Sequence, residues 1–260
     1  MYSFLTKESF FANIDLQKED VFFFPTTDST NEQAREHFLC GAAARPALFI
    51  AKEQTRGKGT RGRSFDSGEG GLYFSLLIPI EEGQISASEV TPLAAAAVSY
   101  AVKKLIGKSA DGLFIKWVND LFIKDRKICG ILCERVNEKG KSAFIVGIGI
   151  NLLHREFPSE LSSIASSIED MTGERILPEE ILPLILGELI DALVRKKTAR
   201  LKRIYRKHFM KKGVRVTVTD GLGISRNAEI LGLYKDLSLK VLYDDGERAK
   251  IISGDLSIKL

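Results

Sequence analysis

A short basic segment, TRGKGTRGRSF at residues 55–65, is the first candidate for chemistry. It holds three glycines and the four cations Arg56, Lys58, Arg61 and Arg63, with no acidic residue. Four like charges repel one another, so the segment is costly to order without a counter-ion. Glycine exposes backbone N–H groups, which bind phosphate together with Arg and Lys side chains. The pattern therefore predicts a loop that closes around a phosphate-bearing ligand, with a flexible, solvated loop as the alternative.

Two common nucleotide-binding motifs do not account for this loop. Gly57, Gly59 and Gly62 match G-x-G-x-x-G, but a dinucleotide site needs a helix directly after the loop. Residues 60–71 instead hold four glycines and no apolar periodicity. The Gly-Lys-Ser tripeptides at 107–109 and 140–142 each lack the glycine that a P-loop has five residues earlier. The segment is therefore expected to be a mobile loop between two strands.

The elements that position this loop are predicted from apolar patterning. Strands are expected at 47–54 and 72–80 on either side of it, and at 113–118, 127–136 and 143–153, with short polar connections typical of antiparallel hairpins. Helices are expected at 28–39, beginning with a capping box formed by Ser29 and Glu32, from Thr91 and Pro92 to Gly107, and over 178–212. Four short strands follow, which predicts two domains, 1–212 and 213–260.

Composition limits the classes of protein that remain. The chain has 260 residues, 44% hydrophobic content, a net charge of +4 and a pI near 8.8, which is too weakly basic to indicate nucleic-acid binding. Its three cysteines give no disulfide framework, and no histidine lies at metal-ligand spacing from them. No apolar run reaches the ~18 residues of a membrane span. The first residues lack the pattern of a signal peptide, so we expect a soluble cytoplasmic protein.

Several segments, in order along the chain, resemble those of biotin–protein ligases. They are DSTNE, AKEQTRGKGTRGRSF, GLYFSLLIP, KWVNDL, DRKICGIL and GIGINL, and ISGDLSI is similar to the end of the small C-terminal domain of that family. The resemblance covers roughly residues 22–260. It implies an α+β fold: a catalytic domain with a mixed, largely antiparallel sheet flanked by helices, and a small Src-homology-like β-barrel at the C-terminus.

The resemblance implies a reaction in two steps. Biotin and ATP form biotinoyl-AMP, with Mg²⁺ carried by the ATP phosphates rather than by a protein site. A lysine of a biotin carboxyl carrier domain then accepts the biotin. The expected partners are this carrier domain and the two small molecules, with no specific DNA binding and no membrane. The chain is expected to be a monomer or a homodimer.

The resemblance also assigns candidate site residues. The catalytic candidates are Lys127, Arg63 and Asp120: Lys127 bridges the biotin carboxylate and the α-phosphate, and Asp120 orients the incoming lysine. The candidates for biotin binding are Ser29, Thr30, Asn31, Gln54, Gly57, Lys58, Gly59, Thr60, Lys127, Gly130, Ile131 and Gly147. The candidates for ATP or adenylate binding are Lys58, Arg61, Arg63, Phe65, Lys116, Asn119, Lys127, Gly149 and Asn151.

The loop departs from the usual family pattern at three positions. Lys58 keeps a charge without the guanidinium fork, Thr60 replaces an arginine, and Phe65 replaces the tryptophan expected to cover the adenine. Losing one charge-assisted hydrogen bond costs about 1.5–3 kcal/mol. We therefore expect an active ligase that loses its adenylate faster than a Thr60→Arg variant.

Other functions remain as alternatives. A related fold ligates other acyl cofactors such as lipoate, although GKGTRGR together with KWVNDL favours biotin. Some relatives are biotin-binding regulators with an N-terminal winged helix-turn-helix, but only about 20 residues precede VFFFP here, too few for three helices. We therefore expect no operator binding. The segment 195–212 has ten Lys and Arg and no acid, which predicts a solvated helix face, or docking of an acidic carrier domain or nucleic acid.

Overall fold

A seven-stranded mixed sheet forms the main body of the molecule. The computed structural model describes residues 16–41, 44–81, 85–219, 223–252 and 255–258. The strands of this sheet are β1 (Val21–Thr27), β2 (Ala47–Gln54), β3 (Gly71–Ile80), β4 (Leu113–Lys116), β5 (Asp120–Ile123), β6 (Arg126–Glu138) and β7 (Lys141–Asn151), in the order β1-β2-β3-β7-β6-β5-β4. Only the β1–β2 pair is parallel, so the predicted mixed, largely antiparallel sheet is confirmed. The prediction missed β5 as a strand, because its first residue belongs to an Asn-Asp pair typical of turns.

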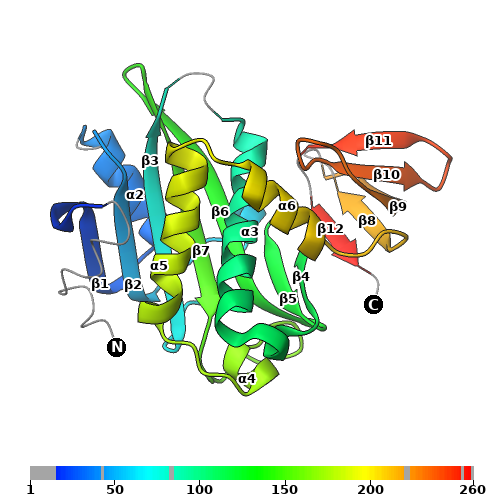
Figure 1. The fold of residues 1–260 in the computed structure, drawn as a ribbon, viewed down its shortest axis with the longest axis horizontal. Coiled ribbons are helices and arrows are strands. Elements are labelled where there is room, and N and C mark those ends of the chain that lie inside the picture. The colour runs from blue at the N-terminus through cyan, green and yellow to red at the C-terminus, as the bar shows by residue number, and fades with distance from the viewer. Residues whose placement is uncertain (1–15, 42–43, 82–84, 220–222, 253–254, 259–260) are drawn as a thin grey trace.

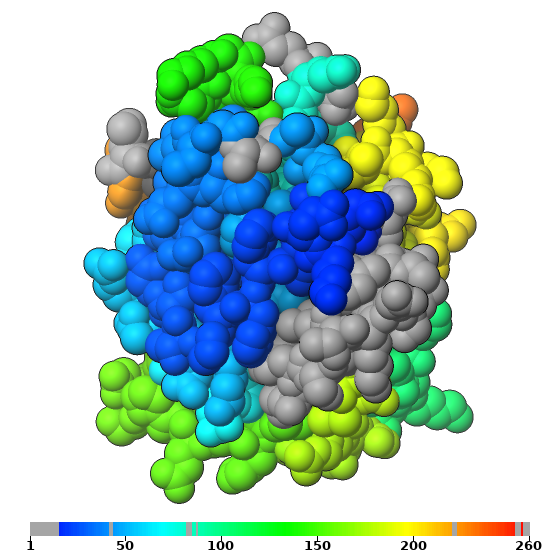
Figure 2. All heavy atoms as spheres, turned by 90° about the vertical axis from the view of Figure 1, so that its left-hand side faces the viewer, coloured from blue at the N-terminus to red at the C-terminus, as the bar shows by residue number. Residues whose placement is uncertain are grey.

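Helices cover both faces of this sheet (Figure 1). They are α2 (Thr30–Leu39), α3 (Ala87–Ile106), α4 (Ile168–Thr172), α5 (Pro178–Leu189) and α6 (Ala199–His208). Helices α3, α5 and α6 pack together on one face, and α2 packs on the other face against β2, β3, β6 and β7. Residues 16–41 cover much of the side of the molecule that Figure 2 shows. Within the described ranges, no helix has both the length and the apolar composition that crossing a membrane requires.

Strand periodicity divides the core into two layers. On β3, Leu72, Phe74 and Leu76 point into the large cluster beneath α3 and α5, whereas Leu77 belongs to the smaller cluster beneath α2. Alternate residues of a strand face opposite sides of the sheet, so each strand serves both layers. Ser75 also lies on the α2 face of the sheet, outside the smaller apolar cluster, and its hydroxyl bonds to Thr30 and Asn31 of α2.

Three predicted helix features are wrong in detail. Helix α3 begins at Ala87, before Thr91 and Pro92, and Val90 of its first turn is buried in the core; Gly107 ends it as predicted. Ser29 is the N-cap of α2, but its side chain forms no capping hydrogen bond; Asp28 Oδ1 instead accepts a bond from Ser29 N–H at 2.7 Å. Residues 178–212 form two helices, separated by a π-turn at 190–194 and an irregular segment.

A second, smaller sheet follows the last helix. Its strands are β8 (Arg215–Thr219), β9 (Ser225–Leu233), β10 (Leu239–Tyr243), β11 (Arg248–Ile251) and β12 (Asp255–Ile258), all antiparallel. The predicted small C-terminal all-β module is present. The order β11-β10-β9-β8-β12 leaves β11 and β12 at opposite edges, and the described strands show no pairing that closes them into a barrel.

Polar contacts join this small sheet to the main body. Trp117 Nε1 donates to Leu237 O at 3.1 Å, and Arg61 Nη2 donates to Thr219 O at 2.8 Å. In α6, Leu201 and Tyr205 are buried, on the side of the helix away from its exposed cations. Some of its cations pair with acids of neighbouring helices, as Lys202 does with Glu89.

Candidate active site

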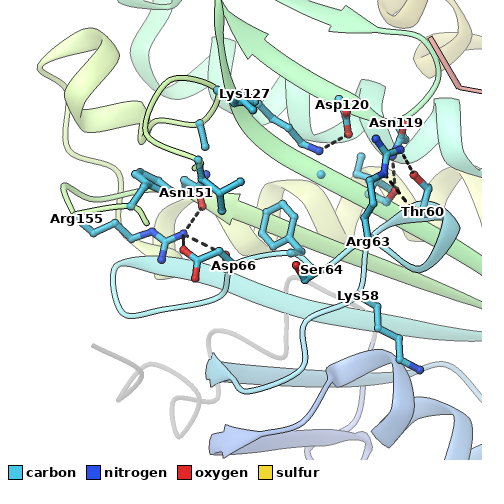
Figure 3. A pocket seen from close by; sticks show the side chains of 18 residues that line it. Lys58, Thr60, Arg63, Ser64, Asp66, Asn119, Asp120, Lys127, Asn151 and Arg155 are labelled. Carbon is cyan, nitrogen blue, oxygen red and sulfur yellow. Dashed lines mark hydrogen bonds and ion pairs between the residues drawn. The ribbon is translucent and has the colours of Figure 1, made fainter. Parts of the chain in front are cut away.

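The candidate site lies on the α2 face of the main sheet, where three segments meet. These are the loop between β2 and β3, the turn and hairpin around β5, and the end of β7. A cavity of about 240 Å³ opens there, and side chains from all three segments surround it (Figure 3). On β7, Gly147, Gly149 and Asn151 face the site, while Ile148 and Ile150 face the core beneath α3. Because successive residues of a strand face opposite sides of the sheet, these two glycines and the Asn151 amide all lie on the site face.

Lys127 and Asp120 form an ion pair in the cavity wall. Lys127 Nζ lies 2.8 Å from Asp120 Oδ1, and their side chains are 26% and 18% exposed. The two residues come from neighbouring strands, β6 and β5, where Asp120 pairs with Gly130. The Lys127 ammonium also lies 5.8 Å from the centre of the Phe65 ring. The Lys127 ammonium is therefore a partly buried cation in the cavity wall, where a bound ligand can contact it.

The four cations of the glycine-rich loop do not converge on one point. Arg63 lines the cavity, and its Nη2 donates to Thr60 Oγ1 at 3.0 Å. Lys58 also lines the cavity, but its ammonium turns away to pair with Glu32 (Figure 3). Arg61 has a left-handed backbone (φ 58°) and bonds to the small sheet, outside the cavity lining.

Arg56 pairs with Asp28 at 3.0 Å. Burial alone would raise the pKa of Asp28, yet the pKa is lowered, because the carboxylate accepts hydrogen bonds from Ser29 N–H, Gln33 and Thr27 and lies beside the Arg56 guanidinium. The start of α2 is therefore held by an ionised side chain.

A second, smaller pocket of about 30 Å³ contains the polar residues of α2. Ser29, Thr30 and Asn31 are each at most 4% exposed. Gln54 Oε1 accepts bonds from Thr30 N at 2.8 Å and Thr30 Oγ1 at 3.1 Å. Buried polar groups at this density require partners, so the pocket is a fixed arrangement of donors and acceptors.

Residues that were not predicted from the sequence support this polar pocket through hydrogen bonds, without lining it. Ser75 Oγ lies 2.6 Å from Asn31 Oδ1, and Asn31 Nδ2 donates to Glu134 Oε2 at 2.8 Å. Arg35 Nη2 pairs with Glu134 at 2.6 Å. Ser75 and Glu134 each sit in a strand without a surrounding motif, so only the strand register places them beside α2.

Phe65 separates the two cavities. Its ring lies over Gly130 and Gly149, which pair across β6 and β7; a Cβ at these positions would approach the ring to 2.8 and 2.5 Å. Phe65, Lys58 and Gly130 line both cavities. The ring also contacts Tyr73 edge to face at 6.4 Å. The ring thus lies at the boundary that the two cavities share.

Other predicted residues occupy varied positions. Gly59, Thr60 and Asn119 line the larger cavity, and Asn119 Nδ2 donates to Ile131 O at 3.0 Å. Ile131 lines it too, although its residue is packed in the core cluster. Besides Arg61, two more predicted residues lie outside both linings, Gly57 and Lys116. Gly57 has no room for a Cβ, which would meet Phe65 O at 2.3 Å, so it serves close approach within the loop; Lys116 Nζ lies 5.8 Å from the Phe122 ring.

The segment after β7 forms the far wall, which sequence reasoning did not anticipate. Arg155, whose side chain is buried, forms an ion pair there with the partly exposed Asp66. The apolar part of this wall consists of Phe157, Leu161, Ile164 and Ala165. Nearby, burial raises the pKa of Tyr73 well above its ordinary value, so its hydroxyl stays protonated and donates to Gly68 O at 2.7 Å. Among the described residues no group of three or more His, Cys, Asp or Glu could hold a metal ion.

Comparison with known proteins identifies the family. The model of the biotin/lipoate A/B protein ligase family matches residues 23–151. The biotin–[acetyl-CoA-carboxylase] ligase of Paracoccus denitrificans is 33% identical over 163 residues, which are 61% of this chain and 67% of that protein. The bifunctional ligase/repressor BirA of Bacillus subtilis is 32% identical over 166 residues, 62% of this chain and 50% of that protein. The chain thus spans about half the length of BirA.

A solved structure extends the similarity to nearly the whole chain. The biotin protein ligase of Aquifex aeolicus in complex with biotin and ATP superposes with a TM-score of 0.75 at 27% identity, over 92% of this chain and 98% of that chain. This match includes the small C-terminal sheet as well as the main sheet. The chain therefore belongs to the biotin/lipoate A/B protein ligase family.

Proposed function

We propose that this chain is an ATP-dependent biotin–protein ligase. The observation that carries the proposal is the meeting of a small, buried polar pocket with a larger, cation-lined cavity at Phe65 and Gly130. Such a site suits a ligand with a urea-like head and a carboxylate that must reach a phosphate. Support comes from the name of the Paracoccus relative and from the biotin and ATP in the Aquifex structure.

Biotin would place its ureido ring in the polar pocket. Thr30, Asn31 and Gln54 supply the convergent hydroxyl and amide groups that such a ring requires. The absence of a side chain at Gly147 is needed there, because a Cβ would lie 2.0 Å from Asn31 Oδ1. The valeryl chain would then run along β6 and β7, with its carboxylate directed toward Lys127.

ATP would occupy the larger cavity. Its adenine would lie against the apolar wall of Phe157, Leu161 and Ile164 and not beneath Phe65, whose ring lies on the sheet glycines. Its phosphates would lie near Asn151 and Arg63. The described acids of the cavity are already paired, Asp120 with a lysine and Asp66 with an arginine. The residues present therefore do not form a site for a resident metal, and we propose that Mg²⁺ enters bound to the phosphates of ATP.

The reaction has two displacement steps. A biotin carboxylate oxygen attacks the α-phosphorus, and the bond to the β-phosphate breaks to release pyrophosphate. Lys127 lowers the repulsion between the two anions and stabilises charge on the phosphoryl oxygens. The amine of a carrier lysine then attacks the acyl carbon, AMP leaves, and Asp120 accepts the amine proton.

The partner is proposed to be a biotin carboxyl carrier domain. Residues 1–212 would form the catalytic domain, and residues 213–260 a small domain that contacts the glycine-rich loop through Arg61. The contact between Arg61 and Thr219 supports a role of the small domain in holding this loop.

Calorimetric titration and pyrophosphate exchange test the function. We expect biotin to bind and to support exchange between labelled pyrophosphate and ATP, and lipoate to do neither. Binding and exchange with lipoate alone would instead identify a lipoate ligase.

A further inference from the structure

Arg155 is a buried cation in the cavity wall that the family motifs do not include. Its side chain is 9% exposed, and Nη2 lies 2.8 Å from Asp66 Oδ2 and 3.1 Å from Asp66 O. The same nitrogen lies 3.4 Å from Asn151 Oδ1 (Figure 3). The centre of the Phe157 ring lies 4.2 Å from Arg155 Cζ. One guanidinium therefore contacts three segments of the wall at once.

Part of this guanidinium has no partner. Arg155 Nε is buried and makes no hydrogen bond within the part of the chain that the structure describes. Burying a charge is expensive, and an ion pair that served stability alone would be expected to satisfy every donor. Because Arg155 lines the ligand cavity, a ligand bound there is a natural source of the missing acceptor.

Asp66 connects Arg155 to the rest of the site. It lies between Phe65, whose ring covers the glycine floor, and Ser67. Ser67 is bonded to the end of β2: Gln54 N donates to Ser67 O at 3.0 Å, and Gln54 Nε2 donates to Ser67 Oγ at 2.9 Å. The returning limb of the glycine-rich loop is thus held at the polar pocket through Gln54 and at the nucleotide end through Arg155.

We propose that Arg155 is a positioning residue for the nucleotide half of the active site. Through Asp66, Arg155 fixes the position of the Phe65 ring over the sheet. Through Asn151, it orients an amide at the end of β7. Its Nε donates to an oxygen of the bound nucleotide. This inference rests on the proposed ligase function. It predicts that damage to the pair weakens ATP binding and leaves biotin binding intact, because the Gln54 anchor does not depend on Arg155.

Three variants perturb the pair in different ways. Arg155→Lys keeps the charge but loses the planar guanidinium, and with it the Nε donor. Asp66→Asn keeps the shape of the side chain and removes its charge. Gly68→Ala adds a methyl group and removes no side chain. The new Cβ would lie 2.8 Å from Arg155 Nη1, and the backbone of Gly68 has no positive φ. The methyl should therefore displace the guanidinium without straining the backbone.

We expect each variant to raise the KM for ATP in pyrophosphate exchange about tenfold or more, the effect of losing one charge-assisted bond. The Kd for biotin, measured without ATP, is expected to stay within about twofold, as for sites that do not couple. A second readout is tryptic cleavage after Arg61 and Arg63, located by mass spectrometry. Biotin with a non-hydrolysable ATP analogue should protect the wild-type loop and protect the variants less.

Two control variants match these changes away from the site. Lys202→Met removes the cation of a partly buried pair with Glu89 on the α3 face, and Gly187→Ala adds a methyl where the structure has open space. Both should leave the KM for ATP unchanged.

The possible results separate the two claims. A wild-type protein that shows no exchange with biotin would refute the ligase proposal itself. Active wild type together with an unchanged KM for ATP in the three variants would overturn the role of Arg155. A parallel loss of biotin affinity and stability would also overturn it, since Arg155 would then serve the fold alone.

Discussion

Replacement of Lys127 by methionine is expected to separate the catalytic use of its charge from its structural use. Lys127 Nζ lies 2.8 Å from Asp120 Oδ1, and both side chains are more than two-thirds buried. A charge-assisted hydrogen bond contributes about 1.5–3 kcal/mol, and the remaining solvent contact reduces this. Lys127→Met should therefore lower the free energy of unfolding by about 1–2 kcal/mol, partly because Asp120 is left as an uncompensated charge.

The effect on chemistry should be larger than the effect on stability. The ammonium is the cation proposed to meet the carboxylate and the α-phosphate, and removing such a group typically costs about 10²–10³ in rate. Biotin-dependent pyrophosphate exchange measures this loss, and urea denaturation measures the stability. The variant should remain folded and still bind the ureido end of biotin, because the polar pocket does not contain Lys127.

A double-variant cycle with Asp120→Asn decides between the two uses. The combination of Lys127→Met and Asp120→Asn removes both charges, so we expect stability to return toward the wild-type value while exchange stays low. Recovery of exchange in the double variant would refute the reasoning, because the lysine would then act only by neutralising Asp120. Near wild-type exchange in Lys127→Met alone would remove this residue from the catalytic group.

Three further predictions concern single positions. Gly147→Ala would place a methyl 2.0 Å from Asn31 Oδ1, so calorimetry should find biotin affinity lost while the circular dichroism spectrum persists. Thr60→Arg should slow the loss of bound adenylate after dilution by roughly 10- to 150-fold, the equivalent of one charge-assisted bond; an unchanged rate would make Thr60 a neutral substitution. Burial raises the pKa of the Cys129 thiol, so iodoacetamide at pH 8 should alkylate the exposed Cys40 and reach Cys129 only after unfolding, which peptide mapping would show.

Much of the fold follows from local pattern. Strands β2, β3, β6 and β7 were predicted with ends that differ by two residues or fewer, because long apolar runs bounded by Gly and polar residues leave few alternatives. Two short elements were not predicted. Strand β5 has four residues and α4 has five, and neither is long enough to show a period.

The residue types of the site were also visible in the sequence, but their partners were not. The segment TRGKGTRGRSF predicted a phosphate loop, yet its cations lie in different places, with Lys58 on Glu32 and Arg61 on the small sheet. These partners are 26 and 158 residues away in the chain. Local spacing contains no information about contacts at such separations.

The sequence by itself determined the family, the strand-loop-strand that carries the basic loop, and the glycines that leave space on the sheet. Only the tertiary structure decided that Phe65 lies on those glycines and that Arg155 meets Asp66. The physical reason is the pairing of β6 with β7 in one register. A slip of β7 by one residue would turn Gly149 and Asn151 toward the core, away from Gly130, and bring the apolar side chains of β7 to the site face.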